Sequence, residues 1–504
     1  MAWVLAVDLG NGGPKVAAVH TDGTLGPTAQ RPVSVDIGVD GRATQDAGEW
    51  WPALVECIHE VTSQMGSEPA TAVGITGQWG STVPVDEHGE AVGPVLLWAD
   101  TRARPLMKDV IGGPISVQGF SPFKVLPWIR LTGGAPTPSG ADPTGHSLLL
   151  QHEMADVYAR ARWLMEPVDF LGMRFTGRAA GTPASMILSW LTDNRIGVEP
   201  RYVDSLVRKA QRDPHRLPPL VPMGSVLGGV LPEVAEATGL PPGIRVVTGL
   251  PDLHAAILGS GAIEPYATHV TVSTTAWISS RVPFKRTDVL HSMASVPGFD
   301  SQMPVVANNQ EIGGGALRWL RQQVVDEDYA DLTAAAATAP AGCEGALFAP
   351  WLNGERSPVE DKELRGAFVG LSLRTDRAMM IRAVMEGVAL NARWLFDTYE
   401  KFCKRRIDSV RILGGGAQSD LWCALYAGIL DRPVEKVANP RDAQLVGAAL
   451  WALVSLGEMT LPEAAARVKV ERNFDPADCD REVYQGAYAE YRGLYKRLRG
   501  LGAR

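Results

Sequence analysis

The chain is short of cysteine, and the cysteines that it has form neither a disulfide nor a metal-binding pattern. The 504 residues include five cysteines, an odd number, widely spaced and without a Cys-x-x-Cys pair. Small secreted domains use dense, evenly numbered cysteines, and zinc sites place them at short fixed spacings. The sequence therefore favours reduced structural thiols at Cys57, Cys343, Cys403, Cys423 and Cys479.

A membrane segment and an excess of positive charge are also missing. The opening run "MAWVLAVDLG" lacks a basic region and reaches Asp8 far short of a membrane span, so we expect no signal peptide or anchor and a cytoplasmic location. The formal net charge is −8, and the basic run from Tyr491 is better explained as a solvated helix face than as a nucleic-acid patch. We expect no membrane or nucleic-acid partner.

Familiar glycine and catalytic motifs are absent as well. The chain has no Gly-Lys-Ser/Thr phosphate loop, no intact G-x-G-x-x-G, no H-E-x-x-H and no G-x-S-x-G elbow. Any nucleotide site must therefore use a different scaffold.

The composition is that of an ordinary globular protein, with 45% hydrophobic and 21% charged residues. The length exceeds what one hydrophobic core usually serves, so at least two domains are expected.

The pattern of the first half predicts an α/β fold. "WVLAVDLG" and "KVAAVHT" flank a turn at "NGGP", which indicates a hairpin, and a third strand follows Asp22-Gly23. "TAVGITGQ" and "PVLLWAD" are typical of short buried strands, and the Gly/Pro-rich segment from Thr132 predicts a surface loop.

The second half repeats this organisation without repeating its residues. "HVTVSTTAWISS" again alternates as two strands around a turn. A long core helix is expected from Arg377, and "SVRILGGGAQSDLWCALYAGIL" predicts a strand, a glycine turn and a helix capped by Ser419. Two α/β halves with a cleft between them are the simplest organisation.

Three glycine-bearing turns follow strands, at Asp8, Ser273 and Leu413. Such turns present free backbone amides to an anion, although simple chain reversal explains each one separately. A fourth stretch, "VTGLPDLHAAILGSG", places Asp252 at the start of a short helix. Asp252 is either a helix cap or a catalytic carboxylate, and this stretch alone leaves both interpretations open.

The chain resembles the FGGY carbohydrate kinases of the actin-like ATPase superfamily, with xylulokinases as the most similar subgroup. The resemblance is nearly full length, and its motifs occur in the family's order. They are "VDLG", "GITGQ", "LLWADTR", "PVDFLGMRFTG", the Asp252 turn, "IGGGALRWL", "FAPWLNGERSP", "RGAFVGL", "RAVMEGVA" and "LGGGAQSDLW".

The resemblance implies two actin-like (ribonuclease H-like) α/β domains with an interdomain cleft. Residues 1–262 would carry the sugar-binding side and the catalytic Asp, and residues 263–504 the nucleotide-binding side. A homodimer is one option for the assembly.

The implied activity is ATP-dependent phosphorylation of a hydroxyl on a small sugar or polyol. Asp252 would be the general base, since a carboxylate can accept the proton that is lost late in a loose phosphoryl transfer. Asp8 would face Mg²⁺ through water. The implied nucleotide contacts are Asp8, Gly10, Asn11, Gly12, Lys15, Thr274, Gly314, Arg318, Gly415, Gly416 and Asp420.

The implied acceptor contacts are Gln78, Trp79, Asp100, Arg102 and Leu253, and some depart from the xylulokinase pattern. Gln78-Trp79-Gly80 stands where Gln-Met-His-Gly is typical, and Asp252-Leu253 where Asp-Asn is typical. A pocket with fewer polar partners should reject sugars whose hydroxyls stay unpaired, which disfavours D-xylulose itself. Trp98 is left out of this set, because a tryptophan in a buried strand is more often packing.

The phosphate hairpin also departs from the family, with Asn11-Gly12-Gly13 in place of hydroxyl residues. Lys15 is the candidate to replace the lost contacts, with a solvated lysine as the alternative. The acceptor stays open among ketopentoses such as xylulose or ribulose and polyols such as glycerol or erythritol. A non-catalytic sugar or nucleotide sensor is the alternative from a different class.

Overall fold

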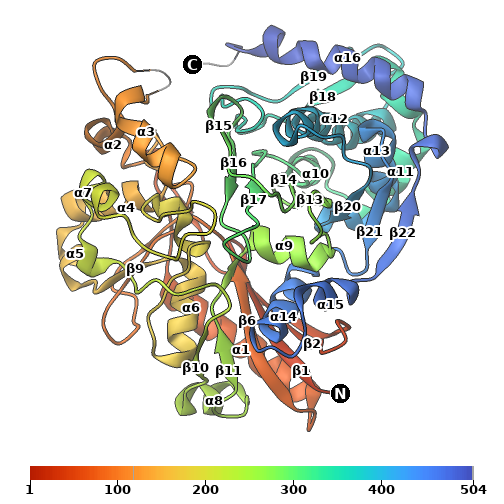
Figure 1. Cartoon of the computed structure of the whole chain (residues 1–504). Coiled ribbons are helices and arrows are strands. Elements are labelled where there is room, and N and C mark those ends of the chain that lie inside the picture. Colours follow the sequence, from red (N-terminus) through yellow and green to blue (C-terminus); the bar gives the residue numbers. More distant parts are fainter. Residues whose placement is uncertain (117–118, 502–504) are drawn as a thin grey trace.

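The computed structural model describes residues 1–116 and 119–501 and shows two α/β units, each built on its own sheet (Figure 1). The strand order of the first sheet is β10-β11-β6-β1-β2-β3, with β12 also paired to β6. Its strands are β1 (Trp3–Gly10), β2 (Gly13–His20), β3 (Leu25–Gln30), β6 (Ala70–Gly77), β10 (Val226–Gly229), β11 (Arg245–Val247) and β12 (Leu250–Pro251). The predicted hairpin and third strand are confirmed, because β1 pairs antiparallel with β2 and β2 with β3.

The two faces of the first sheet are buried against different helices. In β1 the odd-numbered residues Leu5 and Val7 join the cluster that holds α1 (Ala47–Met65), whereas Val4 and Ala6 join the cluster that holds α9 (Asp252–Ser260) and α14 (Ala443–Ser455). Successive side chains of a strand point to opposite faces, so this sheet is covered on both sides. The helices α6 (Pro167–Thr176) and α8 (Pro232–Thr238) complete the α1 side.

The second sheet has the order β14-β13-β20-β21-β22 and repeats the antiparallel hairpin followed by parallel strands. Its strands are β13 (Thr268–Val272), β14 (Ala276–Ser279), β20 (Val410–Leu413), β21 (Val434–Val437) and β22 (Val470–Phe474). The helices of this unit are α10 (Gly315–Leu320), α11 (Tyr329–Thr338), α12 (Arg377–Cys403), α13 (Asp420–Leu430) and α16 (Arg481–Leu498). The long core helix is confirmed as α12, and Ser419 caps α13 by accepting from the Trp422 N–H at 3.3 Å.

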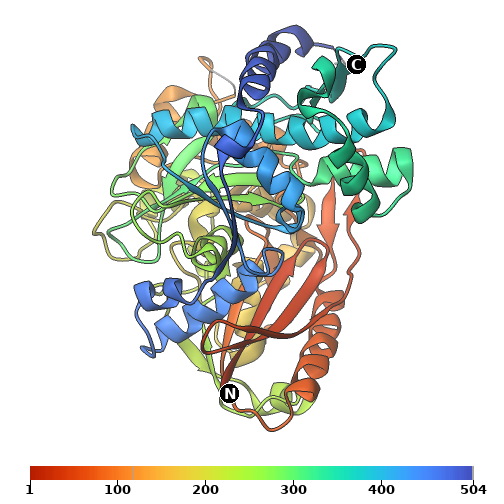
Figure 2. The same ribbon diagram turned by 90° about the vertical axis from the view of Figure 1, so that its right-hand side faces the viewer.

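Helices α9 and α14 lie between the two sheets and join the units (Figures 1 and 2). Helix α14 comes late in the chain but packs on β1 and β6, with a Cβ at Gly74 falling 2.3 Å from the Ala448 carbonyl oxygen. Helix α9, from the first half, also contacts β20 and β13 of the second sheet. The chain therefore crosses back to its first sheet before it ends, with α15 (Leu461–Ala466) following α14.

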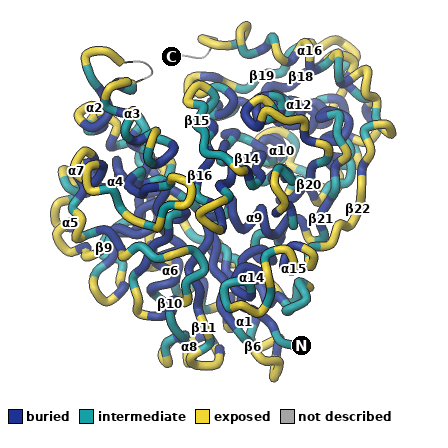
Figure 3. The backbone as a smooth tube through the Cα atoms, in the orientation of Figure 1, coloured by how far each residue is buried: buried dark blue, intermediate teal, exposed yellow. Residues whose placement is uncertain are grey.

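Smaller elements lie outside the two main sheets, in both units. The helices are α2 (Arg104–Ile111), α3 (Pro122–Leu131), α4 (Pro143–Glu153), α5 (Ala155–Arg160) and α7 (Asp204–Lys209). The short strands are β4 (Asp36–Ile37), β5 (Ala43–Gln45), β7 (Val83–Val85), β8 (Val95–Leu96), β9 (Trp163–Met165), β15 (Thr287–Asp288), β16 (Met293–Val296), β17 (Val305–Ala307), β18 (Leu347–Ala349) and β19 (Ala367–Val369). The central strands β1 and β13 and the junction helices are buried, whereas the edge strand β3 is partly exposed and the edge strand β22 is largely exposed (Figure 3).

The surface loop predicted from Thr132 is wrong in part. Thr132 is fully buried, and the predicted loop runs into α4, which Asp142 caps by accepting from the Gly145 N–H at 2.9 Å. The Asp-Pro dipeptide supplied this helix start, with proline at the first helical position. Within the described residues, no helix is both long and apolar enough to cross a membrane.

Candidate active site

Three polar residues sit side by side on the face of the first sheet that meets the junction helices. Asp8 on β1 is the register partner of Lys15 on β2 and of Thr76 on β6. Paired residues of neighbouring strands point to the same face, and Asp8 shares the parity of Val4 and Ala6, which pack on α9 and α14. Period-2 alternation alone therefore aims Asp8, Lys15 and Thr76 at the junction.

Asp252 enters the same place from the neighbouring strand. Strand β12 pairs with β6, with Leu250 opposite Thr76, and α9 starts directly after it at Asp252. The N-cap of α9 is Pro251, without a side-chain cap hydrogen bond, and the Asp252 Oδ1 accepts from the adjacent Leu253 N–H at 2.7 Å. Asp252 is thus the first helical residue and not the cap, with one carboxyl oxygen outside this hydrogen bond.

Asp8 and Asp252 are close enough for their charges to interact. Burial, with a smaller contribution from the charge of Asp8, raises the pKa of Asp252 to about 7, against the Leu253 N–H hydrogen bond that lowers it. Burial also raises the pKa of Asp8, while Lys15 lowers it and Asp442 raises it. Like charges held together in a buried place favour a proton or a cation between them.

Lys15 is held in place rather than solvated. Its Nζ donates to Asp442 Oδ1 and to the Arg441 carbonyl, each at 3.1 Å, and its side chain is 16% exposed. Asp442 stands immediately before α14, so Lys15 joins the first sheet to this late helix. Its contact with a phosphate stays a prediction.

The β1–β2 turn leaves free space where a phosphate is predicted. A Cβ on Gly10 or Gly12 would meet nothing within 4 Å, whereas a Cβ on Gly13, at φ +119°, would fall 2.1 Å from the Arg31 carbonyl oxygen. The Asn11 carbonyl accepts from Gln45 Nε2 at 2.8 Å, and the Asn11 Oδ1 is buried with no partner among the described residues. Gly13 is therefore required by the turn itself, while Gly10 and Gly12 are not.

The predicted nucleotide residues of the second sheet converge in part. The Thr274 carbonyl accepts from Gly313 and Gly315, at 2.9 and 3.2 Å, and the Thr274 Oγ1 accepts from Arg318 Nη2 at 2.9 Å. A Cβ on Gly314 would lie 2.8 Å from the Ser273 carbonyl oxygen. The turn after β13 and the start of α10 therefore form one unit around Thr274.

The last glycine turn packs on the same strand end. A Cβ on Gly416 would lie 2.6 Å from Val272 Cγ1, whereas a Cβ on Gly415 would meet nothing within 4 Å. Asp420 instead forms ion pairs with Lys436 at 2.9 Å and Arg472 at 2.6 Å, across β21 and β22. These two charges lower the pKa of Asp420, and its contact with a nucleotide stays a prediction.

The predicted acceptor residues are linked to the hairpin by amide side chains. Gln78 Nε2 donates to Gln45 Oε1 at 3.1 Å, and Ser81 Oγ donates to Gln78 Oε1 at 3.1 Å. Trp79 donates its indole N–H to the Ser185 carbonyl at 3.1 Å and meets the His254 ring edge-on, with centroids 6.1 Å apart. Trp79 and His254 therefore form an aromatic wall, and His254 lies two residues after Asp252 along the chain.

Asp100 and Arg102 form one buried unit. Arg102 binds Asp100 through Nε and Nη2, at 3.1 and 2.7 Å, and the Ala43 N–H donates to the same carboxylate at 3.1 Å. Asp100 is fully buried, and both of its carboxyl oxygens accept hydrogen bonds from Arg102. Leu253 is 4% exposed and packs in the hydrophobic cluster of the junction, and its contact with an acceptor stays a prediction.

Sequence reasoning missed two polar groups. Thr76 Oγ1 beside Asp8 is buried and lacks a partner among the described residues. Strand alternation is the sequence signal that could have identified it. Glu166 Oε2 accepts from the Gly80 N–H at 3.0 Å, and burial raises its pKa well above the usual range. Glu166 comes from a distant segment, so no local pattern indicated it.

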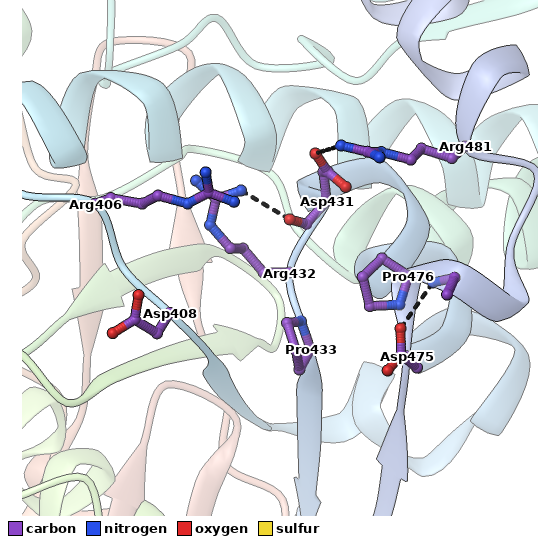
Figure 4. A pocket seen from close by; sticks show the side chains of 9 residues that line it. Arg406, Asp408, Asp431, Arg432, Pro433, Asp475, Pro476 and Arg481 are labelled. Atoms are coloured by element: carbon purple, nitrogen blue, oxygen red, sulfur yellow. Dashed lines mark hydrogen bonds and ion pairs between the residues drawn. The ribbon is translucent and has the colours of Figure 1, made fainter.

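One cavity of about 370 Å³ lies away from this site, before the start of β21 and at the start of α16 (Figure 4). Arg481 pairs with Asp431 at 2.7 Å, and Asp475 accepts from the Ala477 N–H at 2.8 Å. These charged side chains of the lining therefore interact with other lining residues. Neither Asp8 nor Asp252 lines the cavity.

Comparisons with known proteins match both halves of the chain. The N-terminal domain of the FGGY family of carbohydrate kinases matches residues 3–125, and its C-terminal domain matches residues 278–456. The chain belongs to the FGGY family of carbohydrate kinases.

A xylulose kinase of Staphylococcus epidermidis is 27% identical to this kinase over 521 residues, covering 99% of this chain and 98% of the relative. The structure of a ligand-bound xylulose kinase from Lactobacillus acidophilus superposes with a TM-score of 0.86 at 21% identity, over 100% of this chain and 99% of that one. A gluconate kinase from the same organism gives 0.85 at 21% identity, over 99% of each chain.

The carbohydrate kinase has the actin-like ATPase fold with two α/β domains, as expected. Asp252 lies between the two matched segments, which end at residue 125 and resume at residue 278. The role of Asp252 therefore rests on the geometry of the junction.

Proposed function

We propose that this kinase transfers the terminal phosphoryl group of ATP to a hydroxyl of a ketopentose or small polyol, with Asp252 as the general base. The observation that carries the proposal is the convergence of Asp8 and Asp252 at the junction, where the charge of Asp8 raises the pKa of Asp252. A non-catalytic sensor needs no proton acceptor of this kind.

In the proposed step, an Asp252 oxygen accepts the proton of the acceptor hydroxyl while the oxygen of that hydroxyl bonds to the terminal phosphorus. The bond from this phosphorus to the bridging oxygen breaks, and ADP leaves with the electron pair. A pKa of about 7 makes Asp252 a stronger base than an ordinary aspartate near neutral pH, which suits general base catalysis. The short Leu253 hydrogen bond fixes the carboxyl orientation.

The donor set fits Mg²⁺ held largely by phosphate and water. No cluster of three or more His, Cys, Asp or Glu side chains suited to a metal occurs in residues 1–116 and 119–501. Asp8 offers one hard carboxylate beside the orphaned Thr76 hydroxyl, and Mg²⁺ typically uses few protein carboxylates and keeps several waters. Bound Mg²⁺ would neutralise phosphate charge, while Asp8 orients it and Lys15 holds the hairpin to α14.

We assign residues 1–262 to the sugar side and residues 263–504 to the nucleotide side. The convergence of Thr274, Gly314 and Arg318 supports the second assignment. Backbone at these glycines can approach a nucleotide closely because no side chain intervenes. The free thiols, four of which are buried, support a reducing location such as the cytoplasm.

The acceptor side combines the Arg102 guanidinium with an aromatic wall, in which the buried His254 ring packs edge-on behind the Trp79 indole. Such a wall suits sugar C–H groups and offers few partners for an extra hydroxyl. We therefore expect a ketopentose other than D-xylulose, or a polyol such as glycerol or erythritol, to be the best acceptor.

The test is ADP release over a panel of ketopentoses, ketohexoses, aldonates and polyols with MgATP, using the wild type and Asp252→Asn. Asparagine keeps the acceptor for the Leu253 N–H but cannot take the proton. We expect Asp252→Asn to lower kcat about 10²- to 10⁴-fold with ATP affinity retained. Wild-type ATP binding without acceptor-dependent ADP release anywhere in the panel would favour the sensor.

A further inference from the structure

Arg356, from the loop between β18 and β19 of the second unit, reaches across to the first unit. Its guanidinium lies over the ring of Trp98, with Cζ 4.5 Å from the ring centroid. Trp98 follows β8 and is partly exposed, so it is not the core residue that its apolar neighbours indicated. The stack therefore places the Arg356 guanidinium, which belongs to the proposed nucleotide side, against Trp98 of the proposed acceptor side.

The buried carboxylate of Glu311 binds the Arg356 guanidinium. Arg356 Nε donates to Glu311 Oε2, and Glu311 also accepts from Asn353 Nδ2 at 2.9 Å and Lys362 Nζ at 3.2 Å. Burial alone would raise the pKa of Glu311, but the charges of Arg356 and Lys362 lower it. Glu311 therefore stays ionised and orients Arg356.

A second carboxylate connects this support to the predicted nucleotide turn. Glu355 Oε1 accepts from the N–H groups of Glu311 and Arg356, at 2.8 and 2.9 Å. Two residues after Glu311, the Gly313 N–H donates to the Thr274 carbonyl at 2.9 Å. One short segment thus both supports Arg356 and closes the turn around Thr274.

Trp98 is connected in the same way to the acceptor residues. The backbone N–H of Trp98 donates to Ser81 Oγ at 3.2 Å, and Ser81 Oγ donates in turn to Gln78 Oε1. Asp100, the partner of Arg102, follows two residues later. Movement of Trp98 must therefore disturb the acceptor side.

We propose that Arg356 is a positioning residue that couples nucleotide and acceptor binding through its stack on Trp98. The inference rests on the proposed function, which it extends by naming the contact that links the two substrate sides. Because coupling between two ligands is reciprocal, its loss weakens acceptor binding at saturating ATP without weakening ATP binding to the free enzyme.

The test compares Arg356→Ala, Arg356→Lys and Trp98→Ala with Arg492→Ala. Arg492 is a matched control, since it lies over Trp394 at 5.0 Å entirely within the second unit. We expect Arg356→Ala to raise the acceptor KM about tenfold and to increase acceptor-independent ATP hydrolysis relative to transfer. The lysine variant, which keeps the charge but loses the flat face, should lie between it and the wild type.

The double variant Arg356→Ala, Trp98→Ala should have an acceptor KM no higher than that of the more impaired single variant, because both substitutions remove the same contact. Acceptor KM values for Arg356→Ala within twofold of those for Arg492→Ala would overturn the inference. If the wild type releases no ADP with any acceptor, the proposed function fails, and hydrogen exchange then decides the coupling. With a non-hydrolysable ATP analogue, faster exchange at residues 78–81 in Arg356→Ala than in Arg492→Ala supports it, and equal exchange overturns it.

Discussion

Gly259 on α9 and Ala443 on α14 are in direct backbone contact. A Cβ on Gly259 would fall 1.8 Å from the Ala443 carbonyl oxygen, and a Cβ on Gly447 would fall 2.0 Å from the Ala255 carbonyl oxygen. These two helices begin at Asp252 and directly after Asp442. The close crossing therefore sets how far the candidate base lies from the Lys15–Asp442 pair.

Gly447→Ala should lower the free energy of unfolding by about 3 kcal/mol, because the helices must separate to admit a methyl group. Gly486→Ala is the matched control, since this glycine of α16 has nothing within 4 Å of an added Cβ. The control should be stabilising by about 0.5–1 kcal/mol, because alanine restricts the unfolded chain. Urea unfolding measures both, and equal midpoints would show that the crossing tolerates separation.

Alanine substitutions in the predicted phosphate turns distinguish glycines that the fold requires from glycines that ATP binding requires. Gly12→Ala and Gly415→Ala have free space for a Cβ, so neither should change the melting temperature, but both should raise the KM for ATP about tenfold if backbone approaches phosphate there. Gly13→Ala should instead destabilise the protein, because its Cβ meets the Arg31 carbonyl. Unchanged ATP kinetics in the first two variants would remove these turns from the nucleotide site.

The pH dependence should follow the ionisation of Asp252. Its pKa is raised to about 7, and the base is active when deprotonated, so kcat/KM for the acceptor should fall about tenfold per unit below pH 6.5 and level off above pH 7.5. Initial rates between pH 5.5 and 9 at constant ionic strength measure this limb. A flat profile between pH 5.5 and 7 would contradict the assignment of the base.

Lys15→Met should affect nucleotide use most strongly at low pH. Lys15 lowers the pKa of Asp8, so its removal leaves less Asp8 carboxylate as the pH falls. The KM for MgATP should rise several-fold at pH 8 and more at pH 6. Lys108→Met on the outer face of α2 is the control. An equal rise of the KM for MgATP in both variants would show that Lys15 acts only through the net charge of the protein.

Much of the architecture could be predicted from local pattern. The apolar run "WVLAVDLG" and the turn after it predicted β1 and its hairpin with β2. The repeat around "STTA" and the cap at Ser419 also follow from short-range chemistry and appear as β13–β14 and α13. The extent of β8 and the burial of Thr132 were missed, because both depend on distant neighbours.

The sequence by itself determined the fold class and the strands that carry Asp8 and Lys15, since strand patterns and turn chemistry act within a few residues. Only the tertiary structure decided which of these groups meet. Long-range packing brings α14 back onto the first sheet, pairs Asp420 with Lys436 and Arg472, and sets Arg356 over Trp98. Such contacts depend on which buried faces fit together, and no periodicity of the chain encodes that fit.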